Sequence, residues 1–232
     1  MKIEIWSDYA CPYCYIGERQ LEKALESFSG KEDIDISYKA FELDPTASYE
    51  VTTTTKDRVA KKYGYTSEQA QQMIDNVTKY AKSVGLEYHY DTVRYTNTFD
   101  AHRIAKYAET KGKGVEISEK LFHAYFTENK EMSDHKALED IAVEIGLDKL
   151  EVEDVLKNKK FAEDVRNDEY EASRLGINSV PFFLINGKYS LSGAQPPEAL
   201  KNIIEKALQE EKIETDNLGG MVCGIDGCSP SK

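Results

Sequence analysis

Cys11-Pro12-Tyr13-Cys14 is the stretch that decides the fold. It follows the strand-like run 2–6 (Lys-Ile-Glu-Ile-Trp) and precedes the helix-like segment 16–25. Proline is favoured at the first position inside a helix, because its missing N–H would have no partner there. We therefore expect Pro12 to be the first helical residue and Cys11 to be the helix N-cap. A strand, a Cys-x-x-Cys motif and a helix in this order are typical of a thiol–disulfide active site.

The two cysteines of this motif are expected to differ in role. A sulfur at a helix N-cap faces unpaired backbone N–H groups and the positive end of the helix dipole, and both favour the thiolate. Cys11 is therefore the predicted nucleophile. Cys14 lies one turn further along, within reach of Cys11 for forming or resolving a disulfide. The alternative for such a motif is half of a structural zinc site, but a position at a helix start with proline inside favours redox chemistry.

The composition is that of a globular protein, and its charge argues against two classes of partner. The chain has 232 residues, of which 31% are charged, and a formal net charge of -12. Nucleic acid and anionic membranes are unlikely partners on this basis, because both require a basic surface. The sequence contains no apolar run long enough to span a bilayer and no secretory signal pattern at its N-terminus, so we expect a cytoplasmic location.

Four cysteines form two pairs near the two ends of the chain, Cys11/Cys14 and Cys223/Cys228. They are too few to act as a disulfide scaffold in a chain of this size, so a reactive role is the expectation. The second pair is flanked by glycines within a segment rich in Gly, Ser and Asp. It has three interpretations: a redox relay that exchanges with the first pair, half of a four-cysteine zinc site, or an idle reducible pair.

Hydrophobic periodicity predicts an α/β domain interrupted by helices. The expected elements are a strand at 34–41, a helical region at about 56–175, strands at 181–185 and 189–191, and a last helix from about 196 to 211. Asn186-Gly187 between the two late strands is the signature of a type I′ turn. The helical region is a candidate lid or groove wall.

A Val180-Pro181 pair before the late hairpin, together with the early Cys-x-x-Cys motif, resembles the thioredoxin superfamily, whose members carry a cis-proline loop opposite the active-site disulfide. Shorter blocks resemble the FrnE-like branch of the DsbA family more closely. These blocks are 8–14 (Asp-Tyr-Ala-Cys-Pro-Tyr-Cys), 41–43 (Phe-Glu-Leu), 97–98 (Asn-Thr) with 101–103 (Ala-His-Arg), and 179–181 through 193–195. The resemblance covers roughly residues 1 to 211.

The resemblance implies an α/β, thioredoxin-like fold interrupted by an all-helical insertion domain. We expect a discontinuous thioredoxin-like domain at 1–44 and 160–211, a helical insertion domain at 45–159, and a flexible tail at 212–232 that carries the second cysteine pair. It also implies that Cys11 is the nucleophile and forms the mixed disulfide, and that Cys14 resolves it.

A substrate groove beside the cysteines is also implied. Its expected residues are Pro12, Tyr13, Val180 and a cis-Pro181, with His102 as a candidate for its wall. The bland alternative for His102 is a histidine packed at a domain boundary. No metal is expected at this site.

The leading functional hypothesis is a cytoplasmic dithiol–disulfide oxidoreductase or isomerase that acts on protein or small-molecule thiols and disulfides. Glutathione is a candidate reductant or co-substrate, and no bound cofactor is expected. Glutathione-linked relatives of this branch usually carry serine at the position of Cys11, so the retained sulfur favours dithiol chemistry. Tyr13 stands where periplasmic DsbA enzymes have histidine, and Asp8 opposes an anion nearby, so Cys11 is expected to be less acidified than in a strong oxidant.

Two alternatives stay open. One is a glutathione-dependent isomerase or transferase related to hydroxychromene-carboxylate isomerase, in which Cys11 would position a glutathione sulfur. The other is a redox- or zinc-sensing binding module that uses the helical insertion as its partner surface.

Overall fold

A single four-stranded sheet forms the centre of the computed structural model, which describes residues 1–28, 33–219, 221–224 and 227–230, with side chains up to residue 211 and at 213. Its strands stand in the order β2-β1-β3-β4. They are β1 (Lys2–Ser7), β2 (Asp35–Ala40), β3 (Phe182–Ile185) and β4 (Tyr189–Ser192). β1 pairs in parallel with β2 and antiparallel with β3, so the first and last parts of the chain share one sheet.

Helices between β2 and β3 separate the two halves of this sheet in the sequence. They are α2 (Thr55–Tyr63), α3 (Ser67–Ser83), α4 (Phe99–Thr110), α5 (Gly114–Phe126), α6 (His135–Glu144), α7 (Lys149–Lys157) and α8 (Ala162–Arg174). The predicted α/β fold with a helical insertion is confirmed. The predicted domain boundaries at 45 and 159 stay predictions. α4 and α5, which lie inside the predicted insertion, pack on β2 of the sheet, as α8 does.

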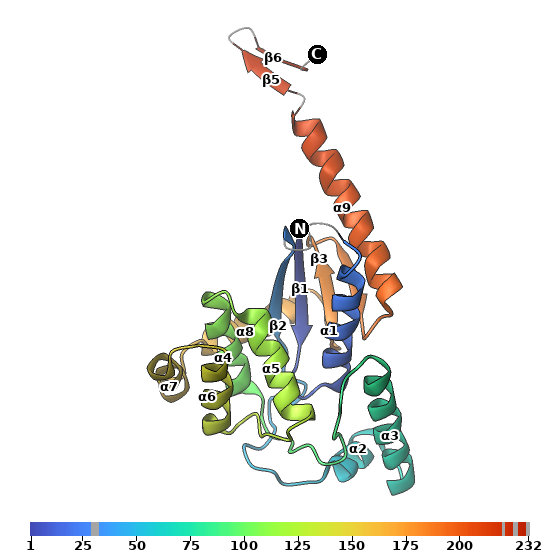
Figure 1. Ribbon diagram of the computed structural model, residues 1–232, viewed down its shortest axis with the longest axis vertical. Coiled ribbons are helices and arrows are strands. Elements are labelled where there is room, and N and C mark those ends of the chain that lie inside the picture. The colour runs from blue at the N-terminus through green and yellow to red at the C-terminus, as the bar shows by residue number, and fades with distance from the viewer. Residues whose placement is uncertain (29–32, 220, 225–226, 231–232) are drawn as a thin grey trace.

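The two faces of the sheet have different covers. α1 (Pro12–Leu25) and α9 (Pro197–Gly219) pack together on one face (Figure 1), where Ile3 and Ile5 of β1 meet Leu21 and Leu200. Trp6 packs with Ala172 of α8. The side chains of a strand alternate between its faces, so Ile3 and Ile5 pack in the apolar layer on one side of the sheet and Trp6 packs in the layer on the other side.

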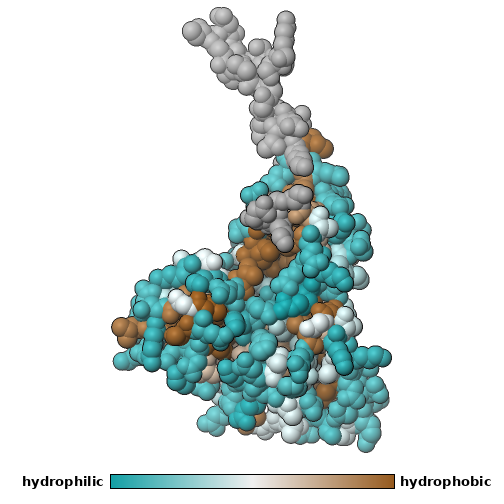
Figure 2. Space-filling view, viewed as in Figure 1, coloured by the Kyte–Doolittle hydropathy of each residue, from teal (hydrophilic) through white to brown (hydrophobic). Residues whose placement is uncertain are grey.

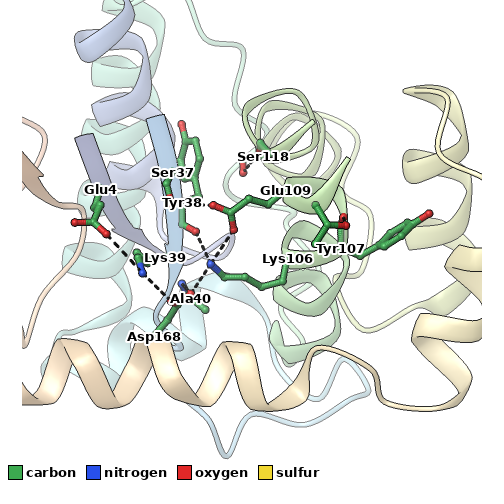
Figure 3. A network of polar contacts seen from close by, with 12 residues as sticks. Glu4, Ser37, Tyr38, Lys39, Ala40, Lys106, Tyr107, Glu109, Ser118 and Asp168 are labelled. Carbon is green, nitrogen blue, oxygen red and sulfur yellow. Dashed lines mark hydrogen bonds and ion pairs between the residues drawn. The ribbon is translucent and has the colours of Figure 1, made fainter. Parts of the chain in front are cut away.

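A polar network ties β2 to the helices that cover it (Figure 3). Lys106 of α4 forms ion pairs with Asp168 of α8 at 2.7 Å and with Glu109 at 3.1 Å, and donates a hydrogen bond to the Tyr38 carbonyl at 3.0 Å. Lys39 of β2 lies 3.3 Å from the same Asp168 carboxylate. These charges are partly shielded from water, so their ion pairs are less screened than exposed ones.

The late hairpin follows the predicted turn chemistry. Asn186 and Gly187 both have positive φ, 49° and 65°, as a type I′ turn requires. The visible face of the molecule is largely hydrophilic (Figure 2). Within the described residues, no helix combines the length and apolar character needed to cross a bilayer.

The C-terminal segment differs from the prediction. The last helix was expected to end near residue 211, but α9 continues to Gly219 and is followed by a two-stranded hairpin, β5 (Met221–Gly224) and β6 (Gly227–Pro230). No proline or glycine interrupts residues 198–218, so nothing in that run stops a helix before Gly219. Figure 1 shows α9 projecting away from the sheet, with the hairpin at its far end.

Candidate active site

The Cys-x-x-Cys motif occupies the start of α1, as predicted. Cys11 is the N-cap with an extended backbone (φ -90°, ψ 113°), and Pro12 is the first helical residue. Cys14 lies one turn along, and its backbone N–H donates to the Cys11 carbonyl at 3.1 Å. Both cysteines are free thiols and are only 4% and 3% exposed.

The cis-proline loop lies directly against the predicted nucleophile. The Val180-Pro181 peptide bond is cis, and the Cys11 thiol lies 3.6 Å from the Val180 carbonyl oxygen, which accepts its hydrogen bond. The cis peptide bond and its position beside Cys11 were both predicted, and both are confirmed. Gly17 permits the close approach of α1 to this loop, because a Cβ there would lie 3.0 Å from Pro181 Cγ.

One expectation for the Cys11 sulfur is wrong. It was expected to meet the unpaired N–H groups of the helix, but the N-cap side chain makes no capping hydrogen bond. The thiol is directed at Val180 of the neighbouring loop instead. The helix start therefore supplies its dipole to this sulfur but no direct hydrogen bond.

Cys14 is held in its protonated form. Burial raises the pKa of the Cys14 thiol well above its ordinary value, and the neighbouring Cys11 sulfur raises it further. The Ser7 hydroxyl and the Asp8 N–H offset only part of this effect. A thiol is a poor nucleophile until it loses its proton, so Cys14 is unsuited to the first attack on a substrate.

A buried carboxylate lies behind the motif. Asp8 accepts backbone hydrogen bonds from Ala10 at 3.1 Å and Leu43 at 2.7 Å, and its Oδ1 lies 3.7 Å from His102 Nε2. Burial opposes ionisation, but the His102 ring and the two N–H groups lower the pKa of Asp8 overall. A negative charge is thus fixed three residues before Cys11 in the chain.

His102 does not line a groove. It is 3% exposed, packs against Tyr9 with the two rings tilted by 38° and their centroids 4.8 Å apart, and lies 3.7 Å from the Asp8 carboxylate. The prediction that His102 lines the substrate groove was wrong. The alternative, a histidine packed at a domain boundary, fits its burial better. The reason is that its side of α4 packs against Tyr9 and Asp8 in the protein interior.

The other four predicted groove residues surround the Cys11 sulfur. Tyr13 is 37% exposed, Val180 is half-buried, and Pro12 and Pro181 are buried. Burial, Tyr63 and then Cys11 raise the pKa of Tyr13, so the phenol lies within electrostatic reach of the nucleophile. The exposed ring is the side chain of this group that offers most surface to a substrate.

Aromatic side chains of the helical insertion pack against the motif, and the sequence did not place them there. The Tyr88 hydroxyl donates to the Pro12 carbonyl at 2.8 Å, and the Tyr88 ring stacks on Phe126 at 4.5 Å. Tyr15 of α1 stacks on Phe122 of α5 at 5.1 Å. No local signal marks these contacts, because each joins residues that are far apart in the sequence.

Glu18 was also missed, although a signal for it exists. It lies four residues after Cys14 on the buried side of α1, where a carboxylate is unusual. Burial, then the neighbouring Glu119, raises the pKa of Glu18 to about 8. Neither of its carboxylate oxygens has a hydrogen-bond partner among the described residues, although the nearby Tyr38 hydroxyl offsets part of the rise in pKa.

Glu18 belongs to an acidic group that could in principle hold a cation. Carboxylate oxygens of Glu18, Glu22 and Glu119 lie within 4.8 Å of one another. Arg19 already forms ion pairs with Glu22 and Glu119. The chain therefore supplies its own positive charge to this group.

The second cysteine pair lies away from the first. Cys223 and Cys228 are opposed in register across the β5–β6 ladder, although their side chains lie outside the described part. Directly opposed residues of an antiparallel pair have Cα atoms about 4.5–5.5 Å apart, which is within the range that a disulfide needs. Figure 1 places the hairpin at the end of the molecule opposite the start of α1.

Comparison with known proteins gives consistent matches. The family described as DSBA-like thioredoxin domain matches residues 2–205. The chain is 28% identical over 216 residues to the uncharacterized protein YwbO of Bacillus subtilis, covering 90% of this chain and 96% of YwbO.

Two solved structures extend these matches. One, described as a probable DsbA oxidoreductase, SCO1869 of Streptomyces coelicolor, is 33% identical and superimposes with a TM-score of 0.84 over 100% of both chains. The other is the cytosolic disulfide reductase DsbM of Pseudomonas aeruginosa with GSH. It is 14% identical and has a TM-score of 0.64, covering 90% of this chain and 100% of DsbM, so it is similar in fold.

Proposed function

Because this chain belongs to the family of DSBA-like thioredoxin domains, we propose that it is a dithiol–disulfide oxidoreductase with Cys11 as its nucleophile. The observation that carries the proposal is the asymmetry of the two thiols. Cys11 is the N-cap beside the Val180 carbonyl, whereas burial keeps Cys14 protonated. Cys11 is thus placed to attack the substrate, and Cys14 to react only after a mixed disulfide has formed at Cys11.

The reaction proceeds in two exchanges. The Cys11 thiolate attacks one sulfur of a substrate disulfide, which forms a mixed disulfide at Cys11 and releases a substrate thiolate. That thiolate accepts the Cys14 proton, and the Cys14 thiolate then attacks the Cys11 sulfur and releases the second substrate thiol. The substrate gains two electrons and the cysteine pair loses two. Two molecules of a small thiol such as glutathione would return the pair to the dithiol and leave as their own disulfide.

Reduction of substrates is the direction we propose. Strongly oxidising enzymes of this type stabilise their reduced form, and with it the nucleophilic thiolate. Here the Cys11 sulfur receives no hydrogen bond from the helix, Tyr13 adds no positive charge, and Asp8 stands behind it as a buried anion. A site that supplies nothing to stabilise its reduced form makes the dithiol the better electron donor, which suits the reducing cytoplasm that we propose as its location.

Insulin reduction and glutathione conjugation, measured in parallel, test this proposal. We expect the protein to accelerate the reduction of insulin disulfides by a thiol and to give no conjugation of an electrophile to glutathione above background. Conjugation or isomerisation without insulin reduction would favour the glutathione-linked alternative and overturn the proposal. The Cys14→Ser variant serves as a control, since it retains Cys11 and lacks the dithiol.

We also propose that Cys223 and Cys228 form a second redox pair, which exchanges with Cys11 and Cys14 of another copy. The register of the hairpin supports their pairing. The 23 residues of α9 span about 34 Å at 1.5 Å per residue, and they carry the hairpin away from the end where Cys11 lies. Exchange within one chain would require α9 to unwind, so exchange between chains is the simpler route.

The relay predicts a dependence on protein concentration. In full-length protein, we expect the second-order rate of reoxidation of Cys11/Cys14 to rise with concentration. In the double variant Cys223→Ser/Cys228→Ser, we expect this dependence to disappear, because the partner thiols are gone. Alkylation of quenched samples followed by mass spectrometry measures both pairs. Identical rates in the two proteins would mean that the tail pair is idle.

A further inference from the structure

Three carboxylates, those of Glu18, Glu22 and Glu119, lie together where α1 meets α5. One oxygen of each residue lies within 4.8 Å of an oxygen of the other two. Glu18 and Glu22 are four residues apart on α1 and so share one face of that helix, and Glu119 reaches them from α5. Like charges at these separations repel one another, so the group needs protons or a cation to be stable.

Glu18 is the member of this group that lacks a partner. It is 4% exposed, and neither of its carboxylate oxygens has a hydrogen-bond partner among the described residues. One of these oxygens is the atom that lies near Glu22 and Glu119. Protonation alone does not satisfy the group, because the O–H of a carboxylic acid still needs an acceptor. A buried polar group without a partner indicates that a water or an ion completes the site.

Arg19 contacts two of the carboxylates and leaves Glu18 without a partner. Its guanidinium forms ion pairs with Oε2 of Glu22 and Oε1 of Glu119, and its carbon lies 5.1 Å from the centroid of the Tyr15 ring. The Tyr15 hydroxyl donates to the same Glu119 oxygen at 2.7 Å. The other oxygen of Glu119, Oε2, is buried and has no hydrogen-bond partner in the described part of the chain. Oxygens of Glu18 and Glu119 therefore remain for a ligand.

We propose that Glu18, Glu22 and Glu119 bind one divalent cation that prefers oxygen ligands, with Ca²⁺ favoured over Mg²⁺. When all three carboxylates are ionised, Arg19 leaves two negative charges, which one such ion balances. Ca²⁺ takes carboxylate oxygens at about 2.3–2.6 Å in flexible geometry, which suits oxygens within 4.8 Å of one another. Mg²⁺ requires about 2.0–2.1 Å and near-octahedral ligands, so it suits this spacing less well. The exposed Glu22 gives the ion access from solvent.

The proposed ion joins the helix that begins at the Cys-x-x-Cys motif to the helical insertion. Two of its ligands belong to α1 and the third belongs to α5. A ligand that binds the folded protein and not the unfolded chain stabilises the folded protein. We therefore expect Ca²⁺ to raise the unfolding temperature. Neither thiol of the motif takes part, so this inference does not depend on the proposed function.

Calorimetric titration of the full-length protein with CaCl₂, and separately with MgCl₂, tests the proposal. The protein is first freed of metal with a chelator. The pH is held at about 8.5, because Glu18 has a pKa of about 8 and a bound cation has to displace its proton. We expect one Ca²⁺ per chain with a dissociation constant of roughly 0.1–1 mM, and Mg²⁺ binding at least about threefold weaker. Unfolding temperatures with and without each salt give a second measurement.

Variants assign the binding to this group. We expect Glu18→Gln to weaken Ca²⁺ binding at least about tenfold, the loss of one charged ligand, and to remove the rise in unfolding temperature. Glu119→Gln should have the same effect, since it also supplies a buried oxygen. Glu26→Gln is the matched control, because Glu26 is exposed at the end of α1 and lies outside the group. It should bind Ca²⁺ as the wild type does.

Several results would contradict the proposal. If wild-type protein shows no saturable Ca²⁺ binding, or if Glu18→Gln binds Ca²⁺ as tightly as wild type, the group holds water and no cation. Equal losses in Glu18→Gln and Glu26→Gln would reveal general attraction to an acidic surface and would also overturn the site. Tighter binding of Mg²⁺ than of Ca²⁺ would contradict the stated preference. If Glu18→Gln does not fold by circular dichroism, Glu119→Gln decides by the same criteria.

Discussion

Replacing Cys11 with serine will abolish disulfide turnover, with a loss of at least about a thousandfold, as is usual when a nucleophile is removed. Replacing Cys14 with serine will leave the first exchange intact and trap the substrate as a mixed disulfide at Cys11. The reason is that Cys11 lies at the helix start against the Val180 carbonyl, whereas the pKa of the Cys14 thiol is raised. Insulin reduction measures the loss, and mass spectrometry detects the trapped adduct.

The assignment of the two thiols has an independent check. At mildly acidic pH, iodoacetamide should label Cys11 of the reduced protein faster than Cys14, because only a thiolate reacts and Cys14 holds its proton. The two single-serine variants identify each rate separately. Faster labelling of Cys14, or adducts trapped in Cys11→Ser instead of Cys14→Ser, would reverse the assignment.

Replacing Glu18 with glutamine will stabilise the protein at alkaline pH. The pKa of Glu18 is raised by burial and by Glu119 to about 8, from an ordinary value of 4.5. Below pH 4.5 the carboxyl is protonated in both the folded and unfolded states, so its ionisation costs no stability. Between pH 4.5 and 8 the unfolded state binds fewer protons than the folded state, and the free energy of unfolding falls as pH rises.

The expected size of this effect is large. A difference of about 3.5 pKa units corresponds to about 5 kcal/mol at pH 8 and above, at 1.36 kcal/mol per unit. We therefore expect Glu18→Gln to exceed wild type in free energy of unfolding by about 3–5 kcal/mol at pH 8, and by less than about 1 kcal/mol at pH 5. Urea denaturation at the two pH values measures the difference.

A matched control separates burial from the loss of a charge. Glu26 is exposed at the C-terminal end of the same helix, so Glu26→Gln should change stability little at either pH. If Glu18→Gln and wild type lose stability in parallel between pH 5 and 8, the carboxyl is ionised in the folded protein. The account of Glu18 as a neutral buried acid would then be wrong.

Local chemistry allowed much of the fold to be predicted from the sequence. Pro12 marked the helix start, so the N-cap position of Cys11 followed from residues within one turn of it. Asn186-Gly187 marked the late hairpin in the same way. These features depend on backbone preferences of neighbouring residues, which a sequence displays directly. The cis-proline loop was foreseen only through a family resemblance, because proline itself is usually trans.

The end of α9 shows the limit of such patterns. The residues after 211 were interpreted as a tail because the end of the chain is rich in Gly, Ser and Asp, but the run up to 218 has no proline or glycine and is also compatible with a helix. Composition does not choose between these two states. The same uncertainty affected the second cysteine pair, whose register at Cys223 and Cys228 follows from the pairing of β5 with β6.

The sequence by itself determined the chemistry at the start of α1: two thiols one turn apart, with Cys11 at the N-cap. Only the tertiary structure decided what surrounds them, including the Val180 carbonyl at Cys11 and the His102 ring at Asp8. The physical reason is range. Helix and turn preferences act over a few residues, whereas burial and charge act through space between groups that may be 169 residues apart in the chain, as Cys11 and Val180 are.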